Sequence, residues 1–273
     1  MSKRTLLAWC AMLFGSTLVA AAGAQAARDA AAAVRCGDAI TVDTTLTANL
    51  TCSGSALQVV GPAVLDLGGH TLKGKGTGTG VTLTGPQGAV VTGGTVTGFQ
   101  DGVDVNTWQA RVHDLTVSKN SLAGIQFVSH RPGAVVERNT ITRNGYGIKF
   151  NNDNQDVQVL DNTVTYNTQM GIVASYGVDA SLFQGNRVNR NVMGGMAIYD
   201  STTSILGNEF NSNGGDGLLA SESFAFQYWL IGGNHANNNG GHGINVLTPG
   251  IPDGGGNRAR GNVLNPQCVN ITC

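Results

Sequence analysis

The sequence is poor in charge, in aromatic residues and in long apolar runs. Charged residues make up 12% of the 273 residues and the net charge is −1, so no basic surplus can neutralise phosphates and we expect no nucleic-acid partner. Aromatic residues make up 6%, and after the N-terminus no apolar run is long enough to cross a bilayer, so we expect no membrane span in the mature chain. The 40 glycines are abundant, and 41% hydrophobic residues predict a chain that folds.

Residues 1–26 have the features of a signal peptide. Lys3 and Arg4 precede an apolar stretch from Leu6 to about Ala22, and Ala24-Gln25-Ala26 fits the small-x-small cleavage pattern. We therefore expect a secreted or periplasmic protein whose mature chain begins near Ala27. The alternative is an uncleaved membrane anchor, which the missing charged stop disfavours.

Four cysteines remain after this cleavage, in two pairs far apart in the sequence. An exported chain meets an oxidising compartment, where an even number of cysteines favours disulfides, although sequence alone allows three connectivities. We predict the two local pairs, Cys36–Cys52 and Cys268–Cys273. A four-sulfur metal site is disfavoured because neither pair has C-x-x-C spacing.

Short apolar segments recur throughout the rest of the chain in steps of 21 to 26 residues. One column consists of Leu67, Val91, Val112, Val136, Val159, Phe183, Ile205 and Ile231. A second lies five residues later and consists of Leu72, Val96, Val117, Ile141, Val164, Val188, Phe210 and Ala236. A third follows a glycine in each repeat, from Gly80-Val81 to Gly243-Ile244.

Asparagines recur in the same register between the columns. One series is Asn139, Asn162, Asn186, Asn208 and Asn234, and the other is Asn120, Asn144, Asn167, Asn191, Asn213 and Asn239. Asparagine tolerates the left-handed backbone conformation, so we expect these residues to form repeated tight corners. Stacked in register, their amides can also bond to one another along an axis.

Each apolar segment has only a few residues, is rich in Val, Ile and Thr, and ends at Gly or Asn, which indicates strands rather than helices. Three strands and three corners in about 23 residues predict a parallel β-solenoid whose rungs lie about 4.8 Å apart. Residues 139–148, Asn-Thr-Ile-Thr-Arg-Asn-Gly-Tyr-Gly-Ile, resemble the repeat of the right-handed parallel β-helix proteins, the pectate-lyase-like group.

This resemblance implies an all-β, single-domain right-handed β-helix of about eight to ten rungs. We expect an N-terminal segment and cap over residues 27–60, repeats over 61–248 and a C-terminal cap or tail over 249–273, with one disulfide in each cap. The resemblance does not specify an activity, because the same rungs carry enzymes, binding proteins and structural proteins.

Alternation along the strand that follows each glycine predicts two outward columns. The first reads Thr82, Asp104, Gln126, Lys149, Val173, Ala197, Leu219, Asn245, and the second reads Thr84, Asn106, Val128, Asn151, Ser175, Tyr199, Ser221, Leu247. The rung spacing places Asp104 and Lys149 about 10 Å apart, which one sugar ring can span, and Trp108 offers a stacking surface. The alternative is an ordinary solvated sheet face.

The turns that follow these strands add polar side chains at the rim of the predicted site, namely His130, Arg131, Tyr176, Tyr199 and Asp200. Residues 151–156, Asn-Asn-Asp-Asn-Gln-Asp, carry the oxygen ligands that Ca²⁺ prefers but lack a calcium-loop pattern, so a hydrated turn is the favoured interpretation. No other cofactor is indicated.

Scaffolds of this group are often used on sugars, which leads us to expect action on an acidic polysaccharide, as a lyase or epimerase. Both reactions begin by removing the proton beside a uronate carboxylate, which requires a neutralising cation and a base. We assign Lys149 as the leading base and Arg131 as the partner of the carboxylate, with His130 and Tyr176 as further catalytic candidates. The predicted substrate-binding residues are Asp104, Trp108, Gln126, Asn151, Tyr199 and Asp200.

Two other functions stay open. Hydrolysis needs two positioned carboxylates, for which Asp104, Asp153 and Asp200 are the central candidates. A noncatalytic exported solenoid would bind a glycan or cell-surface partner through the same face, or through the aromatic run Phe224, Phe226, Tyr228 and Trp229. The short chain and the absence of long insertions between repeats favour the noncatalytic function.

Overall fold

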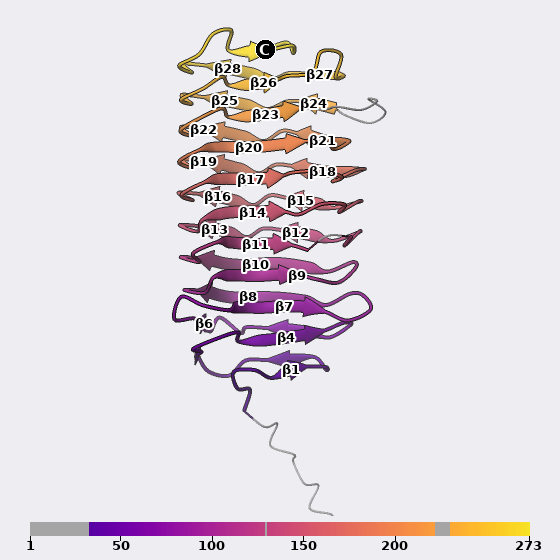
Figure 1. Ribbon diagram of the computed structural model, residues 1–273, viewed down its shortest axis with the longest axis vertical. Helices are drawn as coiled ribbons and strands as arrows, with labels where there is room; N and C mark the ends of the chain where they lie inside the picture. The colour runs from indigo at the N-terminus through magenta and orange to yellow at the C-terminus, as the bar shows by residue number, and fades with distance from the viewer. Residues whose placement is uncertain (1–32, 129, 222–229) are drawn as a thin grey trace, which may run out of the picture. The chain divides into compact units, whose positions relative to one another are not determined.

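Short parallel strands wind into rungs that stack along one axis (Figure 1). The computed structural model describes residues 33–128, 130–221 and 230–273, so the predicted signal peptide and the aromatic run at 224–229 lie outside the described residues. Within these ranges the regular structure is entirely β and contains no helix. The predicted right-handed parallel β-helix is confirmed.

One side of every rung belongs to an 11-stranded parallel sheet, here called sheet A. Its strands are β1 (Ala39–Ile40), β4 (Leu57–Val60), β7 (Thr79–Thr84), β9 (Asp101–Val105), β11 (Ala123–Phe127), β14 (Tyr146–Phe150), β17 (Met170–Ala174), β20 (Gly194–Tyr199), β23 (Leu218–Ser221), β26 (Ile244–Val246) and β29 (Cys268–Val269).

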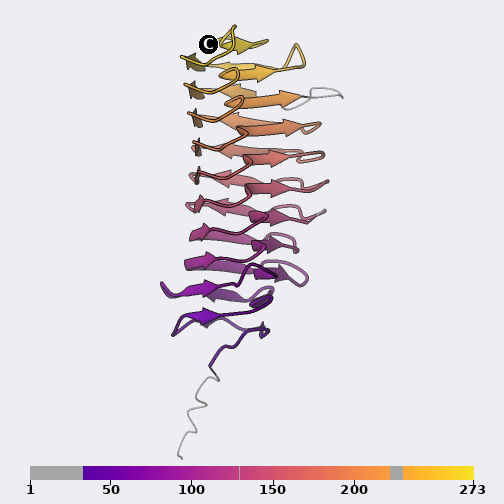
Figure 2. The ribbon, with the colours of Figure 1, turned by 60° about the vertical axis from the view of Figure 1, so that its left-hand side comes forward.

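Two further parallel ladders complete the rungs. Ladder B contains β2 (Thr44–Thr45), β5 (Val64–Asp66), β12 (Val135–Glu137), β15 (Gln158–Leu160), β18 (Ser181–Gln184), β21 (Thr203–Leu206), β24 (Leu230–Gly232) and β27 (Asp253–Gly255). Ladder C contains β3 (Leu50–Thr51), β6 (Thr71–Lys73), β13 (Thr140–Thr142), β16 (Thr163–Thr165), β19 (Arg187–Asn189), β22 (Glu209–Asn211), β25 (His235–Asn237) and β28 (Arg258–Arg260). The long strands β8 (Val90–Thr97) and β10 (Arg111–Ser118) run through both ladders. Figure 2 shows the strands of successive rungs lying above one another.

The predicted apolar columns fill the interior of the helix. Every member of the first two columns is at most 1% exposed, and phenylalanines stack between rungs, with Phe127 and Phe150 ring centroids 4.3 Å apart. The prediction was wrong for Leu67, the first member of the first column. Strand β5 pairs Leu65 with Val91, and Leu67 lies beyond the end of this strand. Leu67 is nevertheless buried, because its backbone N–H bonds to Thr92 and keeps it in the rung.

The asparagine series form two internal ladders, as predicted. Asn139 donates its side-chain amide to Oδ1 of Asn162 over 3.0 Å and to the carbonyl of Val112 over 2.9 Å, and each later rung repeats the pattern. The second ladder ends where Asn262 donates to Oε1 of Gln267. Because these amides are buried and fully bonded, the asparagines are structural.

The left-handed corner residue is not the asparagine, which corrects the sequence-based expectation. In both series the residue immediately before the asparagine has positive φ, for example Asp161 at 54° before Asn162 and Arg190 at 58° before Asn191. The asparagine therefore uses ordinary backbone geometry and turns its side chain inward, while its predecessor makes the corner and points outward.

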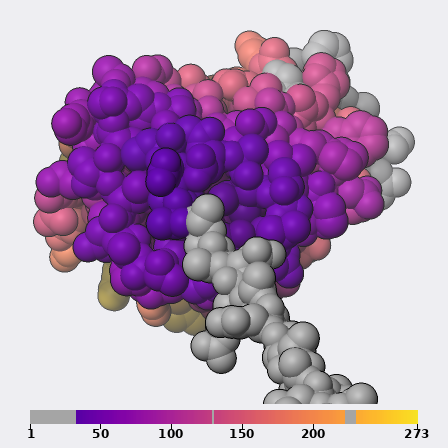
Figure 3. Space-filling model, turned by 90° about the horizontal axis from the view of Figure 1, so that it is seen from below, coloured from indigo at the N-terminus to yellow at the C-terminus, as the bar shows by residue number. Residues whose placement is uncertain are grey.

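The ladders extend on both sides of the predicted repeat limits. Strands β1 to β4 already pair with later rungs, and β27 to β29 continue the three sides toward the C-terminus. Figure 3 looks onto the N-terminal end, where residues of the first rungs, in indigo and purple, form the centre of the surface. Both predicted disulfides are present, with Cα–Cα distances of 5.7 Å for Cys36–Cys52 and 6.1 Å for Cys268–Cys273.

Among the described residues, no helix has the length and apolar character needed to cross a membrane.

Candidate functional site on the outer face of sheet A

The middle strands of sheet A place three predicted polar residues in one outward line. Asp104 on β9 pairs with Gln126 on β11, which pairs with Lys149 on β14. The same register position in the next three rungs is apolar, with Val173, Ala197 and Leu219. The polar line therefore ends at Lys149 on the C-terminal side, whereas on the N-terminal side the same position is also polar, with Thr82 on β7 and Gln58 on β4. Parallel-strand spacing puts Asp104 and Lys149 about 10 Å apart.

A carboxylate that sequence analysis missed lies beside this line. Asp101, the first residue of β9, is only 6% exposed, and its Oδ1 accepts the backbone N–H of Ala123 over 3.2 Å. Burial, with a smaller contribution from the charge of Asp104, raises the pKa of Asp101 to about 6, although the Ala123 N–H and the charge of Lys149 act in the opposite direction. Asp101 therefore titrates near neutral pH, which suits a group that exchanges protons with a ligand.

Asp104 is held by the strand below it. Oγ1 of Thr79, on β7, donates to Oδ2 of Asp104 over 3.1 Å, and burial raises the pKa of Asp104. Within the described part of the chain, the other oxygen, Oδ1, is buried without a hydrogen-bond partner, and so is Oε1 of Gln126 on the neighbouring strand. Two buried acceptors on paired residues are costly to leave unbonded, so this spot favours a proton or a donating ligand group.

Lys149 supplies positive charge at the other end of the line. Its Nζ lies 5.4 Å from the centroid of the Tyr146 ring, on the same strand, and its charge reaches Asp101. The structure thus brings the predicted base into electrostatic contact with a carboxylate that the sequence analysis had not assigned.

Arg131 returns from the loop after β11 to the preceding rung. It donates to Oδ1 of Asn106 through Nε over 2.9 Å and through Nη2 over 2.6 Å, and Nη1 donates to the carbonyl of His130. Asn106 follows β9 and lies two residues beyond Asp104, so the guanidinium is fixed at the edge of the polar line. Two of the five N–H bonds of the guanidinium are not used in these contacts.

The remaining rim candidates stack along the edge where the sheet A strands end. The backbone N–H of His130 bonds to the carbonyl of Asp153, and that of Asp153 bonds to the carbonyl of Tyr176. His130 Nε2 lies 3.1 Å from Asp153 Oδ2. Tyr176 is 54% exposed and Asn151 follows β14 on the same edge. These residues therefore form a continuous rim beside Lys149.

Tyr199 and Asp200 lie two strands beyond Lys149, away from the Asp104 end. Burial, and to a smaller extent the charge of Asp216, raises the pKa of Tyr199. Asp216 itself accepts the backbone N–H of His242 over 2.6 Å and the side-chain amide of Asn245 over 2.8 Å. Tyr199 thus belongs to a second polar group on the later strands, separate from the Asp104–Lys149 line.

Trp108 lies in the turn after β9, two residues past Asn106, and is 53% exposed. Its backbone forms an isolated bridge with Gln87, which fixes the turn in place. An exposed indole at the end of a polar line provides the apolar surface on which sugar rings stack.

The contacts within residues 151–156 fit a hydrogen-bonded turn better than a calcium loop. Asn154 is fully buried, its Oδ1 accepts the N–H of Arg131, and its amide donates to the carbonyl of Asn151, while Asp153 faces His130. Over the described ranges, no group of three or more His, Cys, Asp or Glu side chains is arranged to hold a metal.

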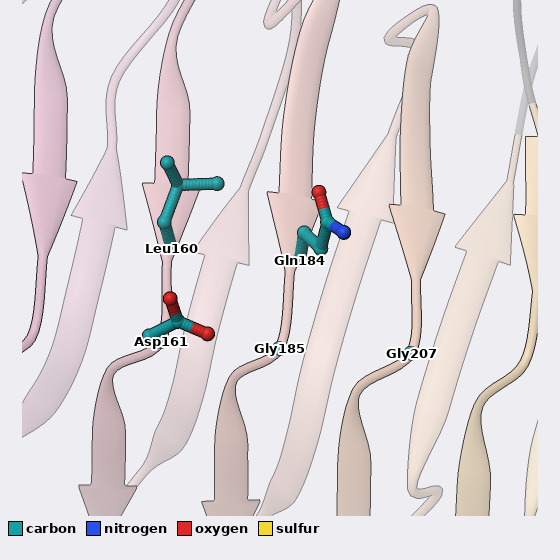
Figure 4. A pocket seen from close by; sticks show the side chains of 5 residues that line it. All are labelled: Leu160, Asp161, Gln184, Gly185 and Gly207. Atoms are coloured by element: carbon teal, nitrogen blue, oxygen red, sulfur yellow. The ribbon is translucent and has the colours of Figure 1, made fainter.

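A surface hollow of about 280 Å³ lies away from sheet A, at the corner after ladder B (Figure 4). It is lined by Leu160, Asp161, Gln184, Gly185 and Gly207, and the two glycines leave its floor as bare backbone. Asp161 is its one titratable lining residue, so the hollow lacks the paired groups that acid–base chemistry needs.

Several solved structures share the fold at low sequence identity. An alginate lyase from Paenibacillus sp. is 14% identical with a TM-score of 0.60, and the match covers 84% of this chain and 90% of the lyase. A mutant of the periplasmic alginate epimerase AlgG is 15% identical with a TM-score of 0.55, and the match covers 85% of this chain but only 64% of the epimerase. The A-module of the Azotobacter vinelandii mannuronan C-5 epimerase AlgE6 is 11% identical with a TM-score of 0.52, and the match covers 85% of this chain and 79% of the module.

A comparison with curated proteins finds no match. The family described as the right handed beta helix region matches the sequence twice, over residues 37–183 and 101–264. These two overlapping matches cover most of the chain, and the parallel rungs of the structure agree with them. The chain therefore belongs to the right-handed β-helix family.

Proposed function

We propose that this exported protein modifies an acidic polysaccharide, by lyase or epimerase chemistry, on the outer face of sheet A. One observation carries the proposal: the carboxyls of Asp101 and Asp104 and the cations of Lys149 and Arg131 gather on three adjacent strands and the loop beside them. The cations can bind the carboxylate of a uronate, and the carboxyls and Lys149 can exchange protons with it. These groups lie close enough together to act on the same sugar unit.

The chemistry assigned to these residues starts at the carbon beside the uronate carboxylate. Arg131 would bind the carboxylate with the N–H bonds that Asn106 leaves free, which stabilises the negative charge that develops when the neighbouring proton is removed. Lys149 is the proposed base and Trp108 the stacking platform. His130 and Tyr176, on the rim, would contact neighbouring sugar units.

The solved structures that share the fold support a polysaccharide as the class of substrate. The lyase and the two epimerases are named for action on alginate or mannuronan, which are uronic-acid polymers. The two disulfides support export, since disulfides persist in oxidising compartments.

The test is ultraviolet absorbance during incubation of the purified protein with a panel of uronic-acid polysaccharides, followed by NMR of the products. Elimination creates an unsaturated bond that absorbs, and epimerisation changes the uronate composition without absorbance. Lys149→Ala and Arg131→Ala should abolish turnover, whereas Lys73→Ala, which removes an exposed lysine from ladder C, should leave it unchanged. Binding without any change in the polymer would instead identify a noncatalytic glycan-binding solenoid.

A further inference from the structure

We infer that the corner between ladder C and sheet A is a second binding site for an acidic polysaccharide, with the polymer lying along the axis of the solenoid. The site is a row of outward side chains on four successive rungs, Lys119, Arg143, Tyr166 and Arg190, here called the basic ridge. The inference takes its class of ligand from the proposed function and goes beyond it, because the ridge lies outside the polar line of sheet A.

The four ridge residues stack in register along the left edge of the solenoid in Figure 1. They directly follow the last residues of β10, β13, β16 and β19. Each has a left-handed backbone with φ between 56° and 58°, and each side chain is exposed. Parallel-strand spacing therefore places Arg143 and Arg190 about 10 Å apart and the two ends of the ridge about 14 Å apart.

Tyr166 holds the two arginines at this separation. The Cζ atoms of Arg143 and Arg190 lie 5.8 Å and 5.6 Å from the centroid of its ring, and they come from the rungs on either side. Nη1 of Arg190 also donates to the hydroxyl oxygen of Tyr166 over 2.7 Å. The described residues accept no other hydrogen bond from either guanidinium, so most of these N–H groups can bind a ligand.

No carboxylate neutralises the ridge. Among residues 33–128, 130–221 and 230–273, no ion pair involves Lys119, Arg143 or Arg190. Glu209 of ladder C bonds to Arg187 instead, over 3.2 Å. Three like charges held within a short distance create a positive potential that attracts an anion.

The corner between ladders B and C shows the contrast. Arg138 occupies a left-handed position there, with a φ of 52°, and it forms ion pairs with both Asp114 and Glu137. That arginine is used inside the protein. The ridge arginines face only each other and a neutral ring, which favours a role in binding.

The side chains beside the ridge favour a polysaccharide as the anion. Ser118, Thr142 and Thr165 precede three of the ridge residues and offer a row of partly exposed hydroxyls, which can bond to sugar hydroxyls while the cations bind carboxylates. Single-stranded nucleic acids need open aromatic faces for their bases, whereas arginines flank the ring of Tyr166. A uronic-acid polymer lying along the ridge satisfies both the charges and the hydroxyls.

The first experiment locates the polymer without requiring turnover. The full chain carrying Lys149→Ala is treated with phenylglyoxal, which modifies arginine, in the presence and absence of each polymer of the uronic-acid panel, and the modified peptides are mapped by mass spectrometry. We expect at least one polymer to protect Arg143 and Arg190 but not the exposed Arg35 near the N-terminus. The same polymer with its carboxylates reduced to alcohols should not protect them. Equal modification of both ridge arginines with and without every polymer would overturn the inference.

The second experiment measures affinity for the protecting polymer. Arg143→Gln combined with Arg190→Gln should weaken binding about tenfold at low salt, the expected effect of losing two exposed charge pairs, and the difference should shrink as salt is added. Arg35→Gln is the matched control and should bind like the unchanged protein, and circular dichroism checks that every variant folds. An unchanged affinity of the folded double variant would overturn the ridge as a binding site. Equal competition by an oligothymidylate would overturn the assignment of its partner.

These outcomes separate the ridge from the proposed function. Protection of Arg131 alone would keep the proposed site on sheet A and overturn the ridge. Protection of the ridge arginines by a polymer that the unchanged protein does not modify would support the ridge and refute the proposed chemistry.

Discussion

The side-chain amide of Asn162 donates to Oδ1 of Asn186 over 3.0 Å, and the Oδ1 of Asn162 accepts the amide of Asn139 over the same distance. Each asparagine is thus a donor to one rung and an acceptor from the other, and the two internal ladders bind the rungs with side chains as well as with backbone. This relationship sets the first prediction.

Replacing Asn162 with Leu should destabilise the protein by about 3 kcal/mol or more, because buried groups of Asn139, Asn186 and Val136 each lose a partner. Urea unfolding followed by circular dichroism measures the loss. Thr163→Leu is the matched control, since the neighbouring Thr163 is not fully buried and its change should cost less than 1 kcal/mol. Equal effects of the two changes would show that the ladder adds nothing to stability.

The corner residue that precedes the ladder asparagine gives a second prediction. Asp161 has a φ of 54°, and Gly185 and Gly207 occupy the same corner in later rungs. Asp161→Gly should therefore change stability little, whereas Asp161→Val should cost about 1 to 2 kcal/mol, the usual penalty of left-handed backbone. Thermal unfolding of the two variants distinguishes them, and a tolerant Val variant would contradict the assignment of strain to this residue.

Asp101 makes stability depend on pH. Its pKa is about 6 in the folded protein and about 3.9 in an unfolded chain, so the folded state binds more protons between these values. The contribution of Asp101 to the free energy of unfolding is present below pH 4 and lost as pH rises through 6, by at most about 3 kcal/mol in total.

Asp101→Asn should remove this loss of stability. The free energy of unfolding of the variant minus that of the wild type should therefore be larger at pH 8 than at pH 4. Urea midpoints measured across this range test the sign. A constant difference between the two proteins would show that Asp101 has an ordinary pKa in the folded state.

The two disulfides should differ in their effect. Chain-entropy estimates give about 3 kcal/mol for Cys36–Cys52, which closes a loop with a sequence separation of 16, and about 2 kcal/mol for Cys268–Cys273, with a separation of 5. Cys36→Ser with Cys52→Ser should thus destabilise more than the equivalent C-terminal pair of changes. Peptide mapping without reduction confirms the pairing, and an order of stabilities opposite to this one would contradict the estimate.

The sequence predicted the line of Asp104, Gln126 and Lys149 because strand periodicity and rung length alone determine which side chains share a register position. It did not predict Asp101, since that residue precedes the glycine and the alternation of side chains was followed only from the glycine onward. The return of Arg131 to Asn106 depends on a loop conformation, and no periodic pattern encodes the path of a loop. Contacts that repeat from rung to rung can be predicted from the sequence pattern. Contacts made by irregular loops require the three-dimensional structure.

The asparagine ladders also bear on how such a protein can change in length. Each asparagine side chain bonds to its equivalents 22 to 26 residues away and to a backbone carbonyl of the preceding rung. A tandem duplication or deletion of one complete rung would therefore recreate these amide contacts at the new junction. The scaffold can therefore gain or lose rungs in single genetic steps while the polar line of sheet A stays intact, provided that the change falls outside β7 to β14. The fold thus allows the length of the solenoid to change separately from the residues of the polar line.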